Sequence, residues 1–244
     1  MGELKRISTG IKGLDDKIEG GFFQGSVNLI AGKTGTGKTA FCASFLYDGA
    51  HKGETGFYVT TEQSEEDIKA DVDAMFGWDL DDLEKKGKLK FLSIKPNVSA
   101  EQSKTDTSRF IKIYTYDLLE KIEKGIKAVR ASRVVIDSVS IIEMFIRDEY
   151  LARAVLMGLM EKLKSMKVTA IFTGTIPETM ESLSGGGIVE YLVDSVIKLD
   201  FVPVAEDYKR TLNVRKMRRT DHSVFIHPFA IEKTGLKVMD VTST

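Results

Sequence analysis

The sequence predicts an α/β protein with a mostly parallel sheet flanked by helices and an antiparallel extension at its C-terminal end. Short runs of β-branched and aromatic residues alternate with longer segments of helical period, as in parallel strands joined by covering helices. After Phe201 this alternation changes to extended segments joined by short polar turns, which is typical of antiparallel strands. A glycine-rich loop follows the first long apolar run and marks the expected ligand site.

Each expected strand is a short apolar run of the length found in buried strands. In chain order the runs are SVNLIAG from Ser26, TGFYVTT from Thr55, KLKFLSI from Lys88, SRVVIDS from Ser132, VTAIFTG from Val168 and SVIKLDF from Ser195. The antiparallel part is expected to comprise RTLNVRKM from Arg210, VFIHPFAI from Val224 and GLKVMD from Gly235.

The connecting segments predict helices, which are expected to begin near Lys38, Ser64, Ser108 and Glu149. One face of the third helix carries an apolar stripe that is expected to pack in the core, and this stripe consists of Leu118, Ile122, Ile126 and Val129. One connection, KPNVSAEQSKTDT at residues 95–107, has no clear period and is expected to be a mobile loop.

Length and composition bound the domain organisation and the class of partner. The chain has 244 residues, 42% of them apolar, which favours a single domain over residues 1–244. Its 35 basic and 36 acidic residues leave a formal charge of -1. No global electrostatic attraction to nucleic acid or to a membrane is therefore expected, and any such contact requires a local patch.

Cysteine content and the first residues indicate the compartment. Cys42 is the only cysteine, which excludes an intrachain disulfide and a cysteine-based metal site and suits a reducing cytosol. The segment MGELKRISTG lacks the apolar part of a signal peptide, and Arg6 stands where a myristoylation motif needs Ser or Thr. No uncharged run is nearly as long as a membrane-spanning helix, which needs about 18 residues. We therefore expect a cytoplasmic protein with no membrane partner.

The loop AGKTGTGKTA, residues 31–40, holds three glycines, two lysines and three threonines directly after the apolar run VNLI. Its residues 32–39 match G-x-x-x-x-G-K-[ST], a pattern in which glycines let consecutive backbone N–H groups turn inward around an anion. The helix expected from Lys38 adds the positive end of its dipole. The loop therefore predicts a polyphosphate site formed by Gly32, Lys33, Thr34, Gly35, Thr36, Gly37, Lys38 and Thr39.

Two residues of this loop have further expected roles. Lys38 is expected to reach the β- and γ-phosphates of a nucleotide, and the Thr39 hydroxyl is expected to ligate Mg²⁺. A magnesium-dependent site also needs a carboxylate at the end of a neighbouring strand, and Asp137 directly follows the apolar residues of RVVID. We expect Asp137 to contact the metal through a bound water.

Hydrolysis also requires a group that orients the attacking water. Glu62, in YVTTEQSEED, stands at the end of the strand that follows the loop helix. The carboxyl ends of strands are where an open α/β sheet builds its site, so Glu62 is the expected catalytic carboxylate. Glu65, Glu66 and Asp67 are interpreted as the acidic first turn of the next helix, which the helix dipole favours.

Three other interpretations of a phosphate loop can be compared with the sequence. SKTD at residues 103–106 is similar to the base-reading motif of GTPases, but it precedes the Asp137 strand and does not close a strand, so we interpret it as a chance match. A small-molecule kinase needs an arginine-rich lid, which no segment between the strands supplies. A nucleotide-binding scaffold without turnover stays open, because the role of Glu62 is inferred from its position.

A second unusual segment is RTLNVRKMRRTDHS, residues 210–223. As an extended chain with a period of two, it places Leu212 and Val214 on one face with four polar residues, namely Lys216, Arg218, Thr220 and His222. Two interpretations are open: a solvated run of charges, or a strand end that delivers positive charge to the γ-phosphate in an adjacent subunit, as an arginine finger does. Arg215 and Arg219 lie on the opposite face and are expected to be surface charges.

A series of motifs runs along the chain in a fixed order. It begins with ISTGIKGLDDKIEGGFFQGSVNLIAGKTGTGKT and continues with YVTTEQ, FGWDL, KGKL, RVVIDSVS and KMRRTDH. This order of motifs, over nearly the whole chain, resembles the RecA-superfamily ATPases of the KaiC-like and archaeal RadA-paralogue type. The resemblance implies a RecA-like core with ATP and Mg²⁺ as ligands. It also implies a homo-oligomer, expected to be a ring of six subunits or a related assembly, with ATP at the subunit interfaces.

In this family the K-M-R-x-T-x-H segment reaches into the site of the neighbouring subunit. The resemblance therefore implies that Lys216 and Arg218 are catalytic in trans, and that Thr220 and His222 bind the neighbour's nucleotide.

Three positions depart from the family pattern. Gln63 follows Glu62 where members often have two adjacent acids, so the expected base chemistry rests on one carboxylate. Arg219 replaces a frequent glycine and adds a charge of unassigned use. Lys233 stands where the clock members have Asp near the adenine, which leaves the base selectivity open.

Two biological roles are compatible with the resemblance. One is a RadA-paralogue accessory in DNA recombination and repair that binds single-stranded DNA or a recombinase; SLSGGGIVE, residues 182–190, occupies the place of a DNA-binding loop but has no Lys, Arg or aromatic residue. The other is a KaiC-like signalling ATPase that phosphorylates itself or docks a signalling protein according to its nucleotide state. No position of the chain matches the phosphorylation sites of the clock members.

Overall fold

The structure, a computed structural model, describes residues 5–94, 107–140, 142, 146, 148–176, 189–204 and 206–241. The motif SKTD, with the rest of residues 95–106, and residues 182–188 of SLSGGGIVE lie outside this description. Within the described residues, no helix is both long enough and apolar enough to cross a membrane.

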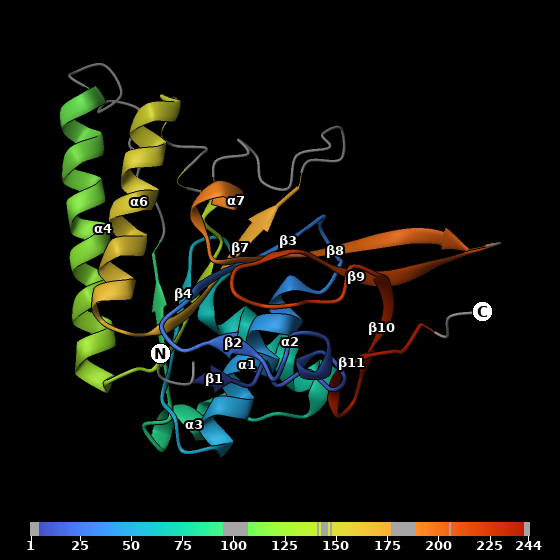
Figure 1. Cartoon of the computed structure of the whole chain (residues 1–244). Helices are drawn as coiled ribbons and strands as arrows, with labels where there is room; N and C mark the ends of the chain where they lie inside the picture. The colour runs from blue at the N-terminus through green and yellow to red at the C-terminus, as the bar shows by residue number, and fades with distance from the viewer. Residues whose placement is uncertain are drawn as a thin grey trace.

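A large sheet organises the described part of the chain, with the strand order β11-β10-β9-β8-β3-β7-β6-β4-β5 (Figure 1). Its parallel strands are β3 (Val27–Gly32), β4 (Gly56–Thr60), β5 (Leu89–Ser93), β6 (Arg133–Asp137), β7 (Thr169–Thr175) and β8 (Ser195–Val204). Its antiparallel strands are β9 (Asp207–Met217), β10 (Ile226–Glu232) and β11 (Gly235–Val238). The prediction of a mostly parallel sheet with an antiparallel C-terminal extension is therefore confirmed.

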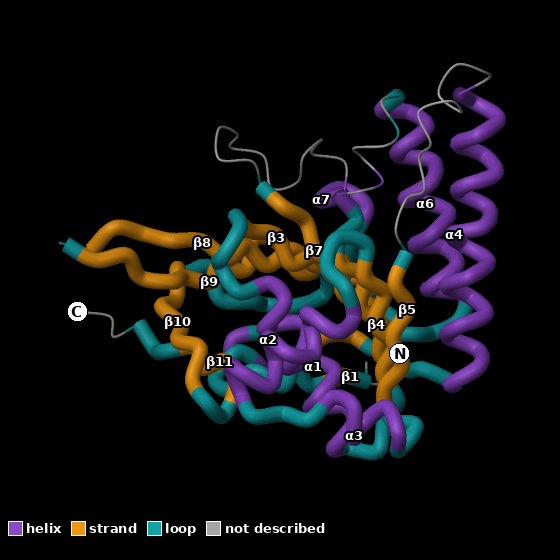
Figure 2. Tube along the Cα trace, turned by 180° about the vertical axis from the view of Figure 1, so that it is seen from behind, coloured by secondary structure: helices purple, strands orange, loops and turns teal. Residues whose placement is uncertain are grey.

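Helices cover both faces of the sheet and produce three layers (Figures 1 and 2). One face is covered by α1 (Lys38–His51), α2 (Glu65–Phe76) and α3 (Leu80–Lys85), and the other by α4 (Thr107–Val129), α6 (Glu149–Ser165) and α7 (Val189–Leu192). The predicted stripe of α4 packs in the core, where Leu118, Ile122 and Ile126 are buried and Val129 is partly buried.

Capping residues explain where several helices begin. Ser64, Asp79 and Asp148 each precede a helix, and each side chain accepts a hydrogen bond from the backbone N–H three residues later. Such a bond satisfies a donor of the first turn that has no partner within the helix. α1 differs, because Gly37 precedes it and offers no side-chain cap, so the first N–H groups of α1 are available to an anion.

Several short elements were not predicted. They are α3, α7, the 3-10 helix η1 (Asp15–Lys17), and a separate two-stranded sheet of β1 (Arg6–Ile7) and β2 (Phe22–Phe23). Elements of two to six residues contain too few repeats of a helical or strand period to be recognised by that period.

The strand register brings the predicted site residues to one edge of the sheet. Gly32, at the end of β3, pairs with Thr175 of β7, and Thr60, at the end of β4, pairs with Asp137 of β6. β6 and β7 also pair in parallel. The carboxyl ends of four strands therefore meet beside the phosphate loop, as expected for an open α/β sheet.

Arg133, the first residue of β6, is buried and joins three parts of the chain. Its guanidinium forms ion pairs with Glu54 and with Asp48, the latter at 3.1 Å. It also donates to the backbone carbonyls of Phe45 at 2.7 Å and Ser8 at 3.0 Å. Because the other end of β6 reaches the site, these contacts hold a strand of the site against α1.

Replacing Arg133 by Ala should lower the free energy of unfolding by about 3–5 kcal/mol, because removing one partner of a buried ion pair leaves the other charges uncompensated. Urea denaturation followed by circular dichroism measures this change. Arg153→Ala, at an exposed position of α6, is the control. If the free energy of unfolding falls by less than about 1 kcal/mol, the value of an exposed ion pair, water screens the pairs of Arg133 with Glu54 and Asp48.

Candidate nucleotide-binding site

The phosphate loop lies between β3 and α1, as its motif requires. Gly35 and Gly37 have φ values of 79° and 109°, in a region that residues with side chains rarely adopt. Thr36 is fully buried, and its hydroxyl donates to the Lys33 carbonyl at 2.8 Å. The conformation of the loop is therefore shaped by residues of the motif itself.

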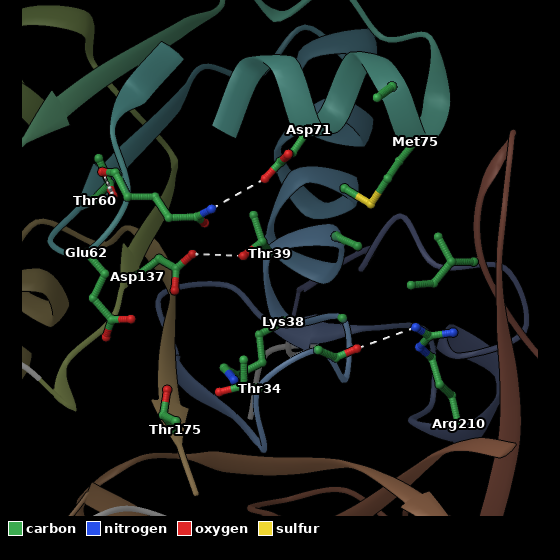
Figure 3. Close-up of a pocket in the computed structure, with 16 residues that line it drawn as sticks. Thr34, Lys38, Thr39, Thr60, Glu62, Asp71, Met75, Asp137, Thr175 and Arg210 are labelled. Atoms are coloured by element: carbon green, nitrogen blue, oxygen red, sulfur yellow. Dashed lines mark hydrogen bonds between the residues drawn. The ribbon is translucent and has the colours of Figure 1, made fainter. Parts of the chain in front are cut away.

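Lys38, the first residue of α1, lies at the centre of the site (Figure 3). Its Nζ donates to the carbonyls of Gly32 at 2.8 Å and Lys33 at 3.0 Å. Burial lowers the pKa of the Lys38 ammonium, and the carboxylates of Asp137 and Glu62 oppose this shift. A partly desolvated ammonium attracts an anionic oxygen more strongly than an exposed one does, because less water screens the attraction.

Asp137 ends β6 and accepts hydrogen bonds from three hydroxyl groups. Its Oδ2 accepts from Tyr58 at 2.6 Å and from Thr39 at 3.4 Å, and its Oδ1 accepts from Thr173. Burial, reinforced by the nearby Asp137 charge, raises the pKa of the Tyr58 hydroxyl well above its usual value, so Tyr58 stays a donor. The contact between Thr39 and Asp137 joins the two residues predicted to serve a metal.

Glu62 and Gln63 follow β4 and make different contacts. The Ser138 hydroxyl donates to Oε1 of Glu62, whose exposed carboxylate lines the cavity (Figure 3). Gln63 donates from Nε2 to Asp71 of α2 at 3.3 Å. Glu62 is thus close enough to Lys38 to affect its pKa, whereas Gln63 is tied to the α2 side of the cavity.

These residues line a cavity of about 640 Å³ that continues from the phosphate loop to α2 and β10 (Figure 3). Its lining comprises Thr34, Gly35, Gly37, Lys38, Thr39, Ala40, Thr60, Glu62, Gln63, Asp71, Ala74, Met75, Asp137, Thr175, Arg210 and Ile231. The loop side is polar, whereas Met75 and Ile231 give the opposite side an apolar character. A ligand with a polyphosphate at one end and an aromatic base at the other matches this division.

The oxygen atoms beside the loop suit a magnesium ion. The Thr39 hydroxyl and the Asp137 carboxylate lie 3.4 Å apart. Mg²⁺ takes octahedral oxygen coordination, usually with one or two protein ligands and with phosphate and water oxygens in the other positions. Across the described ranges, no group of three or more His, Cys, Asp or Glu side chains could hold a metal ion. A metal at Thr39 would therefore depend on oxygens of the nucleotide.

Several residues of the site were not predicted. Tyr58 and Thr173 hold the Asp137 carboxylate, and Thr175 ends β7 beside Gly32. Polar residues at the carboxyl end of an apolar parallel strand are a signal that could have identified both threonines. Tyr58 lies inside its strand and carries no such signal.

Arg210, on β9, was also not assigned to the site. Its Nη2 lies 3.5 Å from the Gly35 carbonyl, and its guanidinium carbon lies 5.2 Å from the centre of the Phe201 ring. Its Nε is buried and has no hydrogen-bond partner among the described residues. Arg210 therefore supplies a cation beside the phosphate loop of its own chain.

Lys233, the residue on which base selectivity was left open, lies in the turn between β10 and β11. Its Nζ donates to the Ala74 carbonyl near the end of α2 at 3.0 Å. Because Ala74 lines the cavity, Lys233 lies next to the side where a base would bind.

The predicted common face of Leu212, Val214 and Lys216 is wrong. Val214 pairs with Ile197 of β8, but Lys216 pairs with Val196, so β9 contains an extra residue at this point. A bulge of this kind reverses the faces of the residues beyond it. Leu212 and Val214 pack in the core on the α1 face, whereas Lys216 lies opposite Val196 on the other face.

Lys216 contacts α7 of its own chain. Its Nζ donates to the carbonyls of Glu190 at 2.9 Å, Tyr191 at 3.3 Å and Val193 at 2.7 Å. Burial lowers the pKa of Lys216, and the nearby Arg218 charge adds to this shift. A cation at the C-terminal end of a helix satisfies carbonyls that have no partner within the helix.

The extended conformation assumed for residues 218–223 is also wrong. β9 ends at Met217, where the expected strand RTLNVRKM ends, and Arg218 and Arg219 form a turn in which Arg219 has a φ of 58°. Arg218, Thr220 and His222 therefore leave the sheet and do not continue one face. Arg218 is exposed, and within the described ranges no ion pair or side-chain hydrogen bond holds its guanidinium.

This turn lies at the edge of the sheet opposite to the phosphate loop. Met217 pairs with Ser195, and Ser195 pairs with Asn28 near the start of β3, whereas the loop follows Gly32 at the other end of β3. At ~3.3 Å per residue, the strand between Asn28 and Gly32 spans about 13 Å. The turn after β9 is thus separated from the phosphate loop of its own chain.

Comparisons with known proteins show which family the chain belongs to. The sequence model of the family described as "ATPase: KaiC" matches residues 7–243. The chain is 34% identical to a "UPF0273 protein" from Thermotoga maritima over 96% of both chains. It is 32% identical to circadian clock protein KaiC3 from Synechocystis, over 98% of this chain and 46% of that protein. A KaiC-like protein from Pyrococcus horikoshii has a similar crystal structure, with a TM-score of 0.81 and 37% identity over 98% of this chain and 100% of that chain.

Proposed function

The chain belongs to the KaiC family of ATPases, and on this basis we propose that it binds ATP with Mg²⁺ and hydrolyses the γ-phosphate. The observation that carries this proposal is the convergence of Lys38, Thr39, Glu62 and Asp137 on one cavity from three separate segments of the chain. An ordinary glycine-rich turn gives no reason for two carboxylates to lie at the ends of neighbouring strands beside it.

Each residue of the proposed site has a distinct part in hydrolysis. Backbone N–H groups of the loop bind the phosphates, and Lys38 donates to the β- and γ-phosphate oxygens, where negative charge develops in the transition state. Thr39 directly and Asp137 through water would hold Mg²⁺, which supplies further neutralisation of the phosphate charge. Glu62 orients the attacking water and accepts its proton, while Ser138 holds one oxygen of that carboxylate.

Release of inorganic phosphate from ATP tests this function directly. The purified protein should release phosphate in the presence of Mg²⁺, and EDTA should abolish the release. Binding of ATP with no release at any protein concentration would contradict hydrolysis and favour a nucleotide-binding scaffold.

We further propose that each active site is shared by two subunits. Lys216 and Arg218 would be catalytic in the site of the neighbour, and Thr220 and His222 would bind the neighbour's nucleotide. The position of the turn supports this arrangement, because about 13 Å of strand separates it from the loop of its own subunit. To reach a phosphate, Lys216 must exchange its contacts with the α7 carbonyls.

Exposed apolar residues next to this turn support association with a second copy of the chain. Val224, Phe225 and Ile226 are 75%, 59% and 59% exposed and follow each other directly. A contiguous exposed apolar patch commonly marks an interaction surface. We propose a homo-oligomer, a ring of six subunits, in which this patch is covered. Light scattering after size-exclusion chromatography, with and without ATP, measures the number of subunits.

Glu62→Gln should bind ATP normally and lower kcat by about 10²–10⁴, the usual contribution of one general base. Gln63→Ala, the matched control at the next position, should have a much smaller effect, because Gln63 contacts α2. Single-turnover hydrolysis and equilibrium binding of a fluorescent ATP analogue separate the two steps. A larger loss of kcat in Gln63→Ala than in Glu62→Gln would contradict the assignment of Glu62 as the water-orienting group.

For the biological role, we propose a RadA-paralogue accessory function in DNA recombination and repair, with single-stranded DNA or a recombinase as partner. The alternative is a KaiC-like signalling ATPase, an autokinase or a nucleotide-dependent scaffold that binds a protein without DNA. Electrophoretic titration of single-stranded DNA with and without ATP tests the first role. Mapping of phosphorylated residues after incubation with ATP tests the second.

A further inference from the structure

The turn after β9 is held by residues from the beginning of the chain. Arg6, in β1, donates from Nη1 to the Thr220 hydroxyl at 3.2 Å. The same guanidinium donates to the carbonyls of Ile18 at 3.0 Å and Gly21 at 2.9 Å, and it pairs with Glu19 at 2.6 Å. The Arg6 side chain is only 15% exposed. A single arginine thus ties the turn to the segment between η1 and β2.

Glu19 links the same two segments. Its Oε2 accepts from Arg6, and its Oε1 accepts a longer bond, at 3.4 Å, from the backbone N–H of Asp221. Glu19 has a φ of 55°, a conformation that residues other than glycine seldom adopt. Such strain is often retained where a side chain serves a function, and here the carboxylate holds both Arg6 and the turn.

The rest of the segment is fixed at both ends by other contacts. Arg218 donates from its backbone N–H to the Asp194 carbonyl at 3.0 Å. Ser223 donates from its backbone N–H to the Lys17 carbonyl at 3.0 Å, and its hydroxyl lies 2.7 Å from Nε2 of His227. Arg6 and Glu19 contact the middle of the segment, two or three residues from Arg218.

We propose that Arg6 and Glu19 are positioning residues for the arginine finger. They hold Thr220 and Asp221 so that the exposed guanidinium of Arg218 is presented to the neighbouring subunit. They do not touch the nucleotide themselves. This inference rests on the shared active site proposed above, and it assigns to the N-terminal segment a part in the neighbour's hydrolysis.

Arg6→Ala should lower kcat by roughly 10–100-fold, because a displacement of about 1 Å in a catalytic group can cost 10² in rate. The state of assembly should match that of the wild type. The dissociation constant for ATP should rise far less than kcat falls, because the phosphate loop is intact and only the contact of Thr220 with the nucleotide is disturbed. Arg6→Lys should be intermediate, since one ammonium can keep the pair with Glu19 but cannot make all the contacts of the guanidinium. Arg153→Ala, at an exposed position of α6, is the matched arginine control and should hydrolyse ATP at the wild-type rate.

Glu19→Asn is the second test, because it weakens the same contacts without removing the buried Arg6 side chain. Asn tolerates the left-handed backbone conformation of this position. Its side chain is shorter than that of Glu and carries no carboxylate to hold Arg6 and Asp221. We expect the same selective loss of kcat as in Arg6→Ala.

Mixing of variants with lowered or abolished activity distinguishes positioning of the finger from other roles. Arg6→Ala mixed with Lys38→Ala should regain partial activity, because some interfaces join an intact phosphate loop to an intact finger. Arg6→Ala mixed with Arg218→Ala should regain none, because every subunit then has a defective finger. Arg218→Ala mixed with Lys38→Ala tests the shared site itself.

Each outcome decides between these ideas. The shared site stands if the mixture of Arg218→Ala and Lys38→Ala regains activity. The positioning role is then overturned if Arg6→Ala alone keeps wild-type turnover, or if mixing Arg6→Ala with Arg218→Ala restores activity. If Arg218→Ala and Lys38→Ala co-assemble without restoring activity, the shared site is overturned, and with it the presentation of the finger to a neighbour. Loss of folding or assembly in both Arg6→Ala and Glu19→Asn makes the pair structural and also overturns the proposal.

Discussion

Lys38→Ala should lose tight ATP binding and keep a folded structure. Each hydrogen bond to a charged group contributes about 1.5–3 kcal/mol, so the loss of contacts to two phosphates corresponds to roughly 10²–10⁴ in the dissociation constant. The fold should tolerate the change, because burial lowers the pKa of Lys38, which means that the folded protein disfavours its charged form.

Thermal unfolding with and without ATP tests both the loss of ATP binding and the integrity of the fold in one experiment. At 100 times the dissociation constant, a ligand stabilises the wild type by about 2.7 kcal/mol, whereas Lys38→Ala should gain little at the same ATP concentration. Without nucleotide, the two proteins should unfold at similar temperatures. Lys124→Ala, an exposed lysine of α4, should behave as the wild type in both conditions. Unchanged ATP affinity in Lys38→Ala would contradict the phosphate-loop assignment.

Arg218→Ala should keep most of the ATP affinity and lose hydrolysis by roughly 10³–10⁵, the range that arginine fingers contribute. The guanidinium is exposed in its own subunit, so its removal should leave the fold intact. Arg218 is a cleaner probe than Lys216, because Lys216 also holds the carbonyls around α7.

A shared site also makes turnover depend on assembly. Activity per subunit should rise with protein concentration, since a lone subunit lacks the finger of its neighbour. Arg218→Ala and Lys38→Ala should each be inactive, and their mixture should recover part of the activity at interfaces that contain both intact residues. Full activity in a monomer, or no recovery in mixtures that demonstrably co-assemble, would show that Arg218 does not act in trans.

Arg210 is the matched control for this interpretation. It lies beside the phosphate loop of its own subunit, within 3.5 Å of the Gly35 carbonyl. If Arg210 acts in its own subunit, Arg210→Ala should regain activity when mixed with Arg218→Ala but not when mixed with Lys38→Ala. Arg218→Ala, in contrast, should regain activity when mixed with Lys38→Ala. Arg210 on β9 and Arg218 in the turn after it thus allow the direction of the shared site to be measured.

The phosphate loop and the strand-ending carboxylates could be predicted because their signals are local. The loop pattern spans eight residues, from Gly32 to Thr39, and Asp137 directly follows an apolar run. The side chains that hold Asp137 could be predicted only in part. Thr173 and Thr175 follow the rule for strand ends, but Tyr58 is recognised only when β4 and β6 are known to be neighbours.

The sequence by itself determined the strands of the large sheet, its antiparallel extension, the four longer covering helices and the phosphate loop, because period and glycine spacing act between residues close in the chain. Only the tertiary structure decided the surroundings of the segment after Val214. A one-residue bulge in β9 places Lys216 on the other face of the sheet. An alternating sequence pattern does not reveal such a bulge. The contact of Arg6 with Thr220 joins residues 214 positions apart, so only the folded chain brings them together.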